Sequence, residues 1–323
     1  ASSQVALPVD EPVTVWKLDV VKRRILIHTG TAVDGHALYP DLDNIMCRTK
    51  LVVKTNAIEI LSRELNPARK RKPFRPCYFM IGGGVGDSCQ PAEERYLLTR
   101  KTLELMEQFG HPVHILTKSC LIERDVDIIE RIHKQTGAVV SMSFSSIDNR
   151  ISALFEPGVP SPAERLATLA AFKKRGIPAG MFLMPVIPFI SDTPPHIHAA
   201  LRAAGENKLD FVIFSPMTLK QGRQQDYFLK TIEKHYPDLL PQYDAIYQGN
   251  RWGSPSCEYS DAVHSVFSDA CQRFHLPPRI PASIFSSILS ENDLISIILR
   301  QLDYICRLRK RQSPYRVAAK SID

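Results

Sequence analysis

Residues that could do chemistry follow three short apolar runs in the middle of the chain. The runs cover residues 113–117, 138–142 and 177–184. The residues that follow them include Lys118, Ser143, Ser145, Pro185, Val186 and Pro188. A lysine can bind a carboxylate as a point charge or form a Schiff base with a carbonyl compound. A pair of serines can contact a ligand, and the free backbone groups of a proline-rich turn can bind a heteroaromatic edge.

A glycine-rich segment follows another apolar run, residues 77–81. It contains Gly83 and Gly84 and leads to Asp87. The spacing fits neither the dinucleotide-binding G-x-G-x-x-G pattern nor a P-loop, because no Gly-Lys-Ser/Thr follows. We expect the glycines to let the backbone approach a ligand closely, with Asp87 at the mouth of the site. A plain tight turn is the alternative.

These residues must be positioned by the elements around them. Apolar runs of strand length alternate with amphipathic helical patterns, which predicts βα units around a buried parallel sheet. The expected helices include one from residue 90 to about residue 109, and one that starts at a capping box over residues 161–164 and reaches residue 175. The carboxyl ends of parallel strands share one edge, so Asp87, Lys118, Ser143 and the turn 185–188 should converge on one cavity. The alternatives are a Lys118 side chain that leaves the rim for solvent and serines that only pack under a helix.

The chain has 323 residues, enough for one large α/β domain with an appendage. We expect an extended leader over residues 1–20, a barrel over 21–220 and a helical extension over 221–323. The extension should contain helices over residues 224–235, 238–247, 259–274 and 291–309. The last helix carries an apolar stripe suited to packing on the barrel or its neighbour, formed by Leu294, Ile297, Ile298, Leu302 and Ile305.

Composition and charge narrow the class of protein. A hydrophobic content of 44% and a charged content of 23% are typical of a globular protein with a sizeable core. The N-terminus has no basic segment followed by an apolar core. The longest apolar run, residues 179–190, is too short to span a bilayer. We therefore expect a cytoplasmic protein without membrane contact.

Part of the net charge of +7 gathers in residues 63–75 and 307–316. Such clusters can mark a nucleic-acid partner, or they can be a solvated linker and the end of a helix. We favour the second reading, because few aromatic residues interleave the charges.

Seven cysteines are scattered along the chain, and no two have the spacing of a zinc or thioredoxin-like site. We read them as reduced thiols, mostly buried. His196 and His198 are two residues apart, which suits a strand better than the helix expected there. These residues predict no metal site, and the sequence leaves the catalytic residues unknown.

Six ordered segments together resemble the radical SAM superfamily, in its spore photoproduct lyase-related branch. The resemblance covers residues 38 to about 305, and the ordered series is much more specific than any single segment. The segments are LVVKTNA at 51–57, DSCQPAE at 87–93, ILTKS at 115–119, SMSFS at 141–145, FEP at 155–157 with SP at 161–162, and MPVIP at 184–188.

The resemblance implies a partial (β/α)6 TIM-like barrel that binds a [4Fe-4S] cluster and S-adenosylmethionine (SAM). Reductive cleavage of SAM would give a 5′-deoxyadenosyl radical that abstracts hydrogen from a substrate. An external electron donor is then required, and the substrate is unknown, with nucleic acid as one candidate.

The resemblance also assigns residues to parts of SAM. The methionine amino group would lie near Gly83, Gly84 and Asp87. Its carboxylate or the ribose would contact Lys118 and Ser143, and we include Ser145 in the same cofactor-binding set. The adenine would be lined by Pro185, Val186 and Pro188.

The chain departs from the family pattern at two places. The family holds its cluster with C-x3-C-x2-C after a Leu-x-Pro segment, but here Leu38-Tyr-Pro40 runs into Asp41 and the triplet is absent. Cys47 alone cannot hold three irons. We hypothesise that the native protein carries about 20 to 30 more residues between Pro40 and Asp41, a segment longer than most loops. The lyase also has a hydrogen-donor cysteine where this chain has Gly84-Val-Gly86, with Cys89 displaced.

Three functions remain open at this point. The first is a radical SAM enzyme of unknown substrate, similar to spore photoproduct lyase. The second is a degenerate, non-catalytic barrel used for binding. The third is a barrel lyase without a cofactor that uses Lys118 as a Schiff base.

Overall fold

The computed structural model describes residues 20–21, 24–27, 56–69, 78–82, 87–248, 252–309 and 311–322. Gly83, Gly84, Cys47 and the segment around Pro40 lie outside these ranges. The chain divides into two compact units, residues 1–138 and residues 139–323. The limits of the predicted leader, barrel and extension stay predictions.

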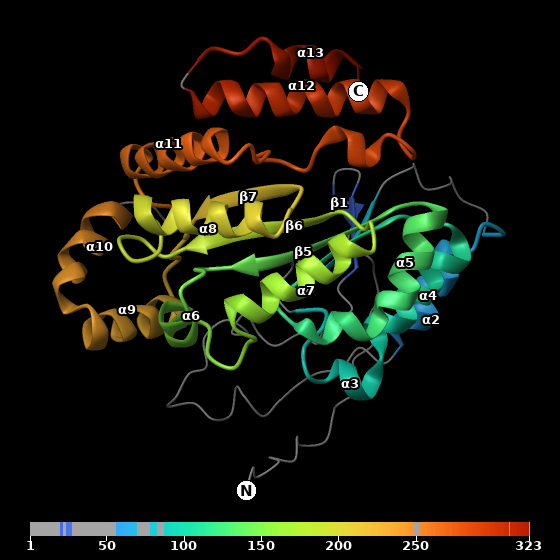
Figure 1. Cartoon of the computed structure of the whole chain (residues 1–323), viewed down its shortest axis with the longest axis horizontal. Helices are drawn as coiled ribbons and strands as arrows, with labels where there is room; N and C mark the ends of the chain where they lie inside the picture. Colours follow the sequence, from blue (N-terminus) through green and yellow to red (C-terminus); the bar gives the residue numbers. More distant parts are fainter. Residues whose placement is uncertain are drawn as a thin grey trace, which may run out of the picture. The chain divides into compact units, whose positions relative to one another are not determined.

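The first unit contains parallel strands with helices between them (Figure 1). A short strand β1 pairs antiparallel with β2, whereas β2, β3 and β4 pair in parallel. Phe79 of β3 is in register with Val113 of β4. The elements are β1 (Val20–Val21), β2 (Arg24–Ile27), α2 (Ala57–Leu65), β3 (Phe79–Gly82), α3 (Glu93–Tyr96), α4 (Leu98–Phe109), β4 (Val113–Thr117), the 3-10 helix η1 (Cys120–Asp125) and α5 (Val126–Gln135).

The single helix that the sequence suggested from residue 90 to residue 109 is divided at Leu97. Leu97 has a positive φ of 53°, which separates α3 from α4. The Glu93 carboxylate accepts hydrogen bonds from the backbone N–H groups of Thr99 (2.9 Å) and Arg100 (3.2 Å). These N–H groups have no partner within a helix that begins at Leu98, so Glu93 caps α4 and the chain turns there.

The second unit repeats the alternation. β5, β6 and β7 pair in parallel, with Met142 opposite Met181 and Met181 opposite Val212. The predicted capping box is confirmed, because Ser161 and Glu164 exchange hydrogen bonds at the start of α7. The elements are β5 (Ala138–Phe144), α6 (Asn149–Phe155), α7 (Pro162–Lys174), β6 (Ala179–Val186), α8 (Pro194–Glu206) and β7 (Phe211–Pro216).

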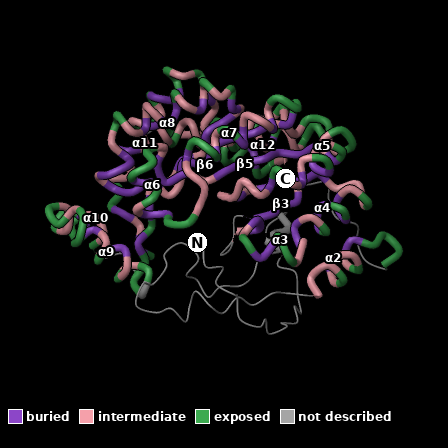
Figure 2. The backbone as a smooth tube through the Cα atoms, turned by 60° about the horizontal axis from the view of Figure 1, so that its bottom comes forward, coloured by how far each residue is buried: buried purple, intermediate pink, exposed green. Residues whose placement is uncertain are grey.

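The strands of the second unit are buried nearly throughout, as Figure 2 shows for β5 and β6. Strands covered on both faces have continuous apolar runs, which explains why the sequence revealed them. Gly180 is required at its position in β6, because a Cβ there would lie 2.3 Å from the ring of Phe211. The two strands can therefore pack closely only around a glycine.

Every element described after β7 is a helix, and all four predicted helices are present. They are α9 (Arg223–His235), η2 (Pro237–Leu239), α10 (Leu240–Tyr247), α11 (Cys257–Arg273), η3 (Ala282–Phe285), α12 (Glu291–Leu308) and a further helix, α13 (Tyr315–Ile322). α11 packs against α8 and β7. In the part of the chain that is described, no helix combines the length and apolar content needed to cross a membrane.

The apolar stripe of α12 does not pack as its spacing suggested. Ile298 and Leu302 remain 44% and 37% exposed, whereas the buried residues of this helix are Ser296 and Asp303. Asp303 accepts an ion-pair hydrogen bond from Arg307 (3.1 Å), which satisfies part of the buried carboxylate. Helical spacing identifies the stripe but does not determine which face the rest of the chain covers.

Candidate functional site

Asp87 is fixed to the end of β4 by hydrogen bonds. Its Oδ1 accepts from the backbone N–H of Cys89 (2.8 Å) and from the hydroxyl of Thr117 (2.5 Å). Its Oδ2 accepts from the backbone N–H of Lys118 (2.6 Å). We expected Asp87 and Lys118 to lie together, and the Asp87 carboxylate does bond to the backbone of Lys118. Each carboxylate oxygen has two lone pairs, so Oδ2 can still accept a hydrogen bond from a cationic ligand.

The residues after β4 are ordered by the same set of hydrogen bonds. Thr117 accepts from the N–H of Ser119 (3.0 Å), and the Ser119 hydroxyl caps η1 by accepting from Leu121 N–H (3.2 Å). Lys118 lies between these two anchored residues and is half-buried. Its backbone position is therefore defined, while its role as a carboxylate ligand stays a prediction.

Cys89 is buried beside this carboxylate, with 1% of its surface exposed. Burial raises the pKa of the Cys89 thiol well above its usual range, and the charge of Asp87 raises it further. The thiolate is the form that binds metals and attacks electrophiles. Cys89 is accordingly a neutral thiol at physiological pH.

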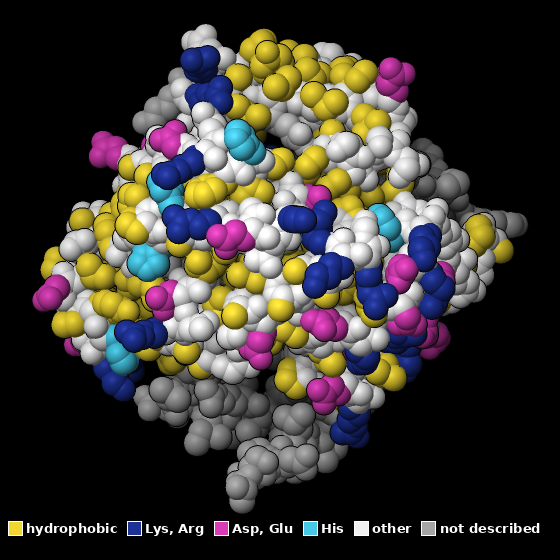
Figure 3. Space-filling model, in the orientation of Figure 1, with side chains coloured by type: hydrophobic (Ala, Val, Ile, Leu, Met, Phe, Trp, Pro, Cys, Tyr) yellow, Lys and Arg dark blue, Asp and Glu magenta, His cyan; other side chains and the backbone are white. Residues whose placement is uncertain are grey.

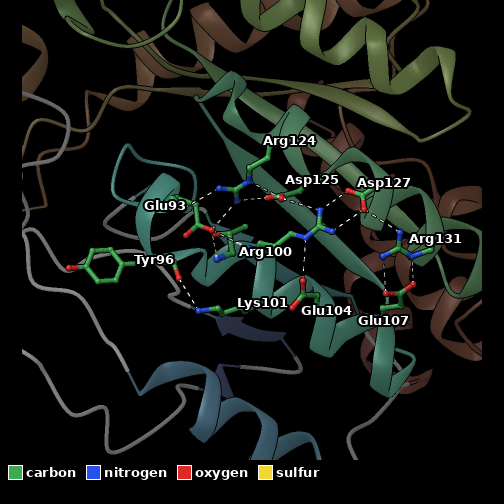
Figure 4. A network of polar contacts seen from close by, with 11 residues as sticks. Glu93, Tyr96, Arg100, Lys101, Glu104, Glu107, Arg124, Asp125, Asp127 and Arg131 are labelled. Atoms are coloured by element: carbon green, nitrogen blue, oxygen red, sulfur yellow. Dashed lines mark hydrogen bonds and ion pairs between the residues drawn. The ribbon is translucent and has the colours of Figure 1, made fainter.

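A network of ion pairs holds α3, α4, η1 and α5 around this end of the first unit (Figure 4). Asp125 is fully buried and pairs with Arg124 (2.7 Å) and Arg100 (3.4 Å). Arg100 also forms a bidentate pair with Asp127 at 2.6 and 2.9 Å. The hydrogen bonds from Arg100 hold the pKa of the Asp127 carboxyl below its usual range. Sequence analysis missed this network, which positions the helices that follow the Asp87 segment.

The end of β5 presents the two predicted serines. Ser143 is half-buried, and its carbonyl accepts from Arg165 (2.5 Å), a fully buried residue whose guanidinium also pairs with Glu156 (3.1 Å). Ser145 is 4% exposed, and its hydroxyl has no hydrogen-bond partner within the described residues. A buried hydroxyl without a partner is costly, so it is a candidate for binding a ligand.

The segment after β6, here called the 185–192 turn, is irregular and internally bonded. The Met184–Pro185 peptide bond is cis, and Phe189 has a positive φ of 63°. The N–H of Ile187 donates to the Ser191 hydroxyl (2.8 Å), and that hydroxyl donates to the carbonyl of Ser145 (2.6 Å). The turn and the end of β5 are thus joined by Ser191, which sequence analysis did not single out.

Three tyrosines from the C-terminal helices hold these strand ends, and we call them the tyrosine brace. Tyr243 of α10 donates to the carbonyl of Pro188 (2.7 Å), and Tyr247 donates to the carbonyl of Met217 after β7 (2.8 Å). Tyr259 of α11 donates to the Asp192 carboxylate. The helical extension therefore positions the ends of β6 and β7.

The pKa values of Asp192 and Tyr259 reflect this burial. Burial raises the pKa of the Asp192 carboxyl, and the hydrogen bond from Tyr259 opposes that rise. The pKa of the Tyr259 hydroxyl is raised by burial and then by the neighbouring Asp192. Tyr259 therefore stays protonated and serves as a hydrogen-bond donor.

The described residues contain no group of three His, Cys, Asp or Glu side chains placed to hold a metal ion. None of the five cysteines among them, at 89, 120, 257, 271 and 306, forms a disulfide within the described residues. Asp87 and Lys118 belong to the first unit, whereas Ser143, Ser145 and the 185–192 turn belong to the second. Their convergence on one cavity stays a prediction, and Gly83 and Gly84 lie outside the described residues.

No protein-family model matches the chain. Uncharacterized proteins of Mycobacterium tuberculosis and Mycobacterium bovis are 28% identical to it over 244 residues, covering 73% of this chain and 69% of theirs. The uncharacterized protein ORF301 of Acidianus two-tailed virus is 24% identical over 135 residues, which is 41% of this chain and 44% of that protein.

Solved structures of spore photoproduct lyase resemble the chain in fold. The lyase complexed with a dinucleoside spore photoproduct has a TM-score of 0.52 and 16% identity, over 77% of this chain and 74% of the lyase. A variant of the lyase with bound S-adenosylmethionine and the same kind of substrate has a TM-score of 0.51 and 16% identity, over 74% and 70% of the two chains. The chain thus has an α/β fold like that of spore photoproduct lyase, of the partial TIM-barrel type that the resemblance implied.

Proposed function

We propose that this protein binds S-adenosylmethionine in the manner of radical SAM enzymes. The observation that carries the proposal is the fold shared with spore photoproduct lyase over 77% of the chain. One solved lyase variant of this fold contains bound SAM. The polar residues at the strand ends of this chain supply the chemistry that such a ligand needs.

In the proposed complex, the methionine part of SAM lies at the residues of the first unit. Its amino group is near Gly83, Gly84 and Asp87, where the remaining acceptor capacity of the Asp87 carboxylate suits an ammonium group. Lys118 holds the methionine carboxylate as a point charge. The anchored backbone of 117–119 supports this role, because a rigid scaffold reduces the entropy lost on binding.

The ribose and adenine belong to the second unit in this proposal. Ser143 and Ser145 bind ribose or carboxylate oxygens, and the buried hydroxyl of Ser145 gains a partner when the ligand arrives. Pro185, Val186 and Pro188 line the adenine. The tyrosine brace holds the same turn in place, because the Tyr243 hydroxyl donates a hydrogen bond to the carbonyl of Pro188.

The [4Fe-4S] cluster does not fit the residues of this chain. A bound cluster would supply the electron that cleaves SAM reductively, and it needs three cysteines. The C-x3-C-x2-C triplet is absent from the 323 residues, and the described cysteines form no ligand group. The hypothesis of about 20 to 30 further residues after Pro40 remains the way to reconcile fold and cluster.

The proposed function also includes a substrate and an electron donor. Spore photoproduct lyase has been solved with a dinucleoside substrate, and this chain has basic residues at 63–75 and 307–316. Nucleic acid is therefore the candidate substrate, and an external donor would deliver the electron. A cytoplasmic location also stays a prediction.

The absent triplet favours a second candidate function, a non-catalytic SAM-binding barrel. The two functions differ in one measurable property. Anaerobic reconstitution with iron and sulfide should leave a chain of this sequence colourless under either function, whereas a native chain that carries the further residues should turn brown only if the protein is the enzyme. A brown protein of this sequence that retains about four irons per chain would contradict our assignment of the cluster ligands to residues outside this sequence.

Calorimetric titration with SAM tests the ligand assignment. Lys118→Ala should weaken binding about 10- to 150-fold, because a charge-assisted hydrogen bond contributes ~1.5–3 kcal/mol. Lys134→Ala is the matched control, since the Lys134 side chain is 71% exposed and forms an ion pair with Glu130 of the same helix. Equal affinity of Lys118→Ala and the control would refute the role of Lys118. Trapping of a carbonyl substrate by borohydride at Lys118 would support a Schiff-base lyase instead.

A further inference from the structure

Helix α12 presents an apolar face that the described part of the chain leaves open. Five large hydrophobic side chains are exposed among the described residues, and three of them, Ile295, Ile298 and Leu302, belong to α12. They are 38%, 44% and 37% exposed, respectively. Figure 3 shows hydrophobic side chains gathered over α12 and α13 at the top of the view. An open apolar face of this kind marks an interaction surface.

The spacing of this face is that of a helix-pairing seam. Ile295, Ile298, Leu302 and Ile305 follow one another at intervals of three, four and three residues. This is the a/d pattern through which two helices pack their side chains into each other. We call these four residues the α12 seam.

Opposite charges end the seam. Glu291 lies seven residues before Ile298, and Arg309, the C-cap residue of α12, lies seven residues after Leu302. Both residues therefore continue the a/d spacing of the seam. Both residues are exposed. The seam therefore reads, from its first position to its last, one acid, four apolar residues and one base.

Such a seam is complementary to itself when it runs in the opposite direction. Around a two-fold axis near Arg300, Ile295 faces Ile305 of the second helix and Ile298 faces Leu302. The same symmetry places Glu291 against Arg309 at both ends. A parallel pair would instead bring Glu291 against Glu291, which is repulsive. Antiparallel pairing also sets the two helix dipoles in opposite directions, which is favourable.

We propose that α12 is a homodimer interface, in which it pairs antiparallel with α12 of a second copy of this chain. The charge complementarity of the seam ends selects this partner over an unrelated helix. The interface is independent of the proposed SAM site, because it needs only α12. A single helix pair is a small interface, so we expect weak association with a Kd on the order of 10 μM.

Sedimentation velocity of the full chain over a range of concentrations around the expected Kd tests the pairing. The mass should rise from 36.4 kDa toward twice that value as concentration increases. Ile298→Lys, which places a charge in the middle of the seam, should weaken dimerisation by at least about tenfold. Val317→Lys is the control, because Val317 is 70% exposed on α13 but lies outside the seam. Circular dichroism should show both variants folded.

A charge exchange tests the orientation. Glu291→Arg should weaken the dimer by placing arginines together at both ends. Adding Arg309→Glu to the same chain should restore the wild-type Kd, because each end again joins an acid and a base. A monomer at every concentration, a dimer insensitive to Ile298→Lys, or a failure of the double exchange to restore pairing in a folded variant would each overturn the proposal.

Discussion

Substitution of Ser145 should change the stability of the chain and its affinity for SAM in opposite directions. Its hydroxyl is buried, and no described residue donates to it or accepts from it. An unsatisfied buried polar group costs ~1–3 kcal/mol, so Ser145→Ala should stabilise the unliganded chain by ~1 kcal/mol after some loss of packing. In a unit of this size, a gain of ~1 kcal/mol raises Tm by about 2–4 °C.

The same change should weaken the binding of SAM. If the hydroxyl bonds to the ligand, its removal loses a net ~0.5–1.5 kcal/mol, which corresponds to about a 2- to 12-fold increase in Kd. Urea unfolding followed by circular dichroism measures the first effect, and calorimetric titration with SAM measures the second. Opposite signs of the two effects are the signature of a ligand-binding hydroxyl.

Ser141→Ala provides the matched control in the same strand. Ser141 is fully buried in β5 and has an interaction partner, so its substitution should lower the free energy of unfolding. A Ser145→Ala chain that is also less stable and binds SAM with unchanged affinity would refute the reasoning. That result would mean that the Ser145 hydroxyl has a structural role.

Two further predictions concern the brace and the pH dependence. Tyr259→Phe removes the hydrogen-bond donor to the buried Asp192 carboxylate, so it should lower the free energy of unfolding by ~1–3 kcal/mol and weaken SAM binding. Adding Asp192→Asn should recover the stability. A Tyr259→Phe chain with unchanged stability and affinity would refute the role of the tyrosine brace. Burial lowers the pKa of His111 below 6.5, so the unfolded state takes up the proton first and stability should fall as pH drops below 6.5. Urea midpoints measured between pH 8 and pH 5 should fall less steeply in His111→Phe, and an identical pH dependence in the two chains would contradict the assignment to His111.

The sequence predicted the parallel strands and the polar residues at their ends, because strands buried on both faces leave continuous apolar runs. It also predicted the start of α7, since a capping box is local in sequence. The break at Leu97 was missed, although Glu93 could have been read as a cap for a second helix. Local patterns thus carry information about local structure only.

Long-range partners could not be predicted in this way. Tyr259 and Asp192 are 67 residues apart, and Tyr243 and Pro188 are 55 apart, so no spacing in the sequence links them. The α12 stripe illustrates the same limit, because its helical spacing was correct while the stripe is only partly covered. Which face of a helix is covered depends on tertiary packing, and here Ser296 and Asp303 lie on the covered face.

The central claim is that this fold binds SAM, and a calorimetric titration of the wild-type chain tests it most directly. We predict saturable binding of one SAM per chain, with ATP as the control for a ligand that shares only the adenosine moiety. ATP should bind at least about tenfold more weakly, because it lacks the methionine groups assigned to Asp87 and Lys118. A folded chain that gives no saturable binding of SAM, or that binds ATP equally well, would contradict the account.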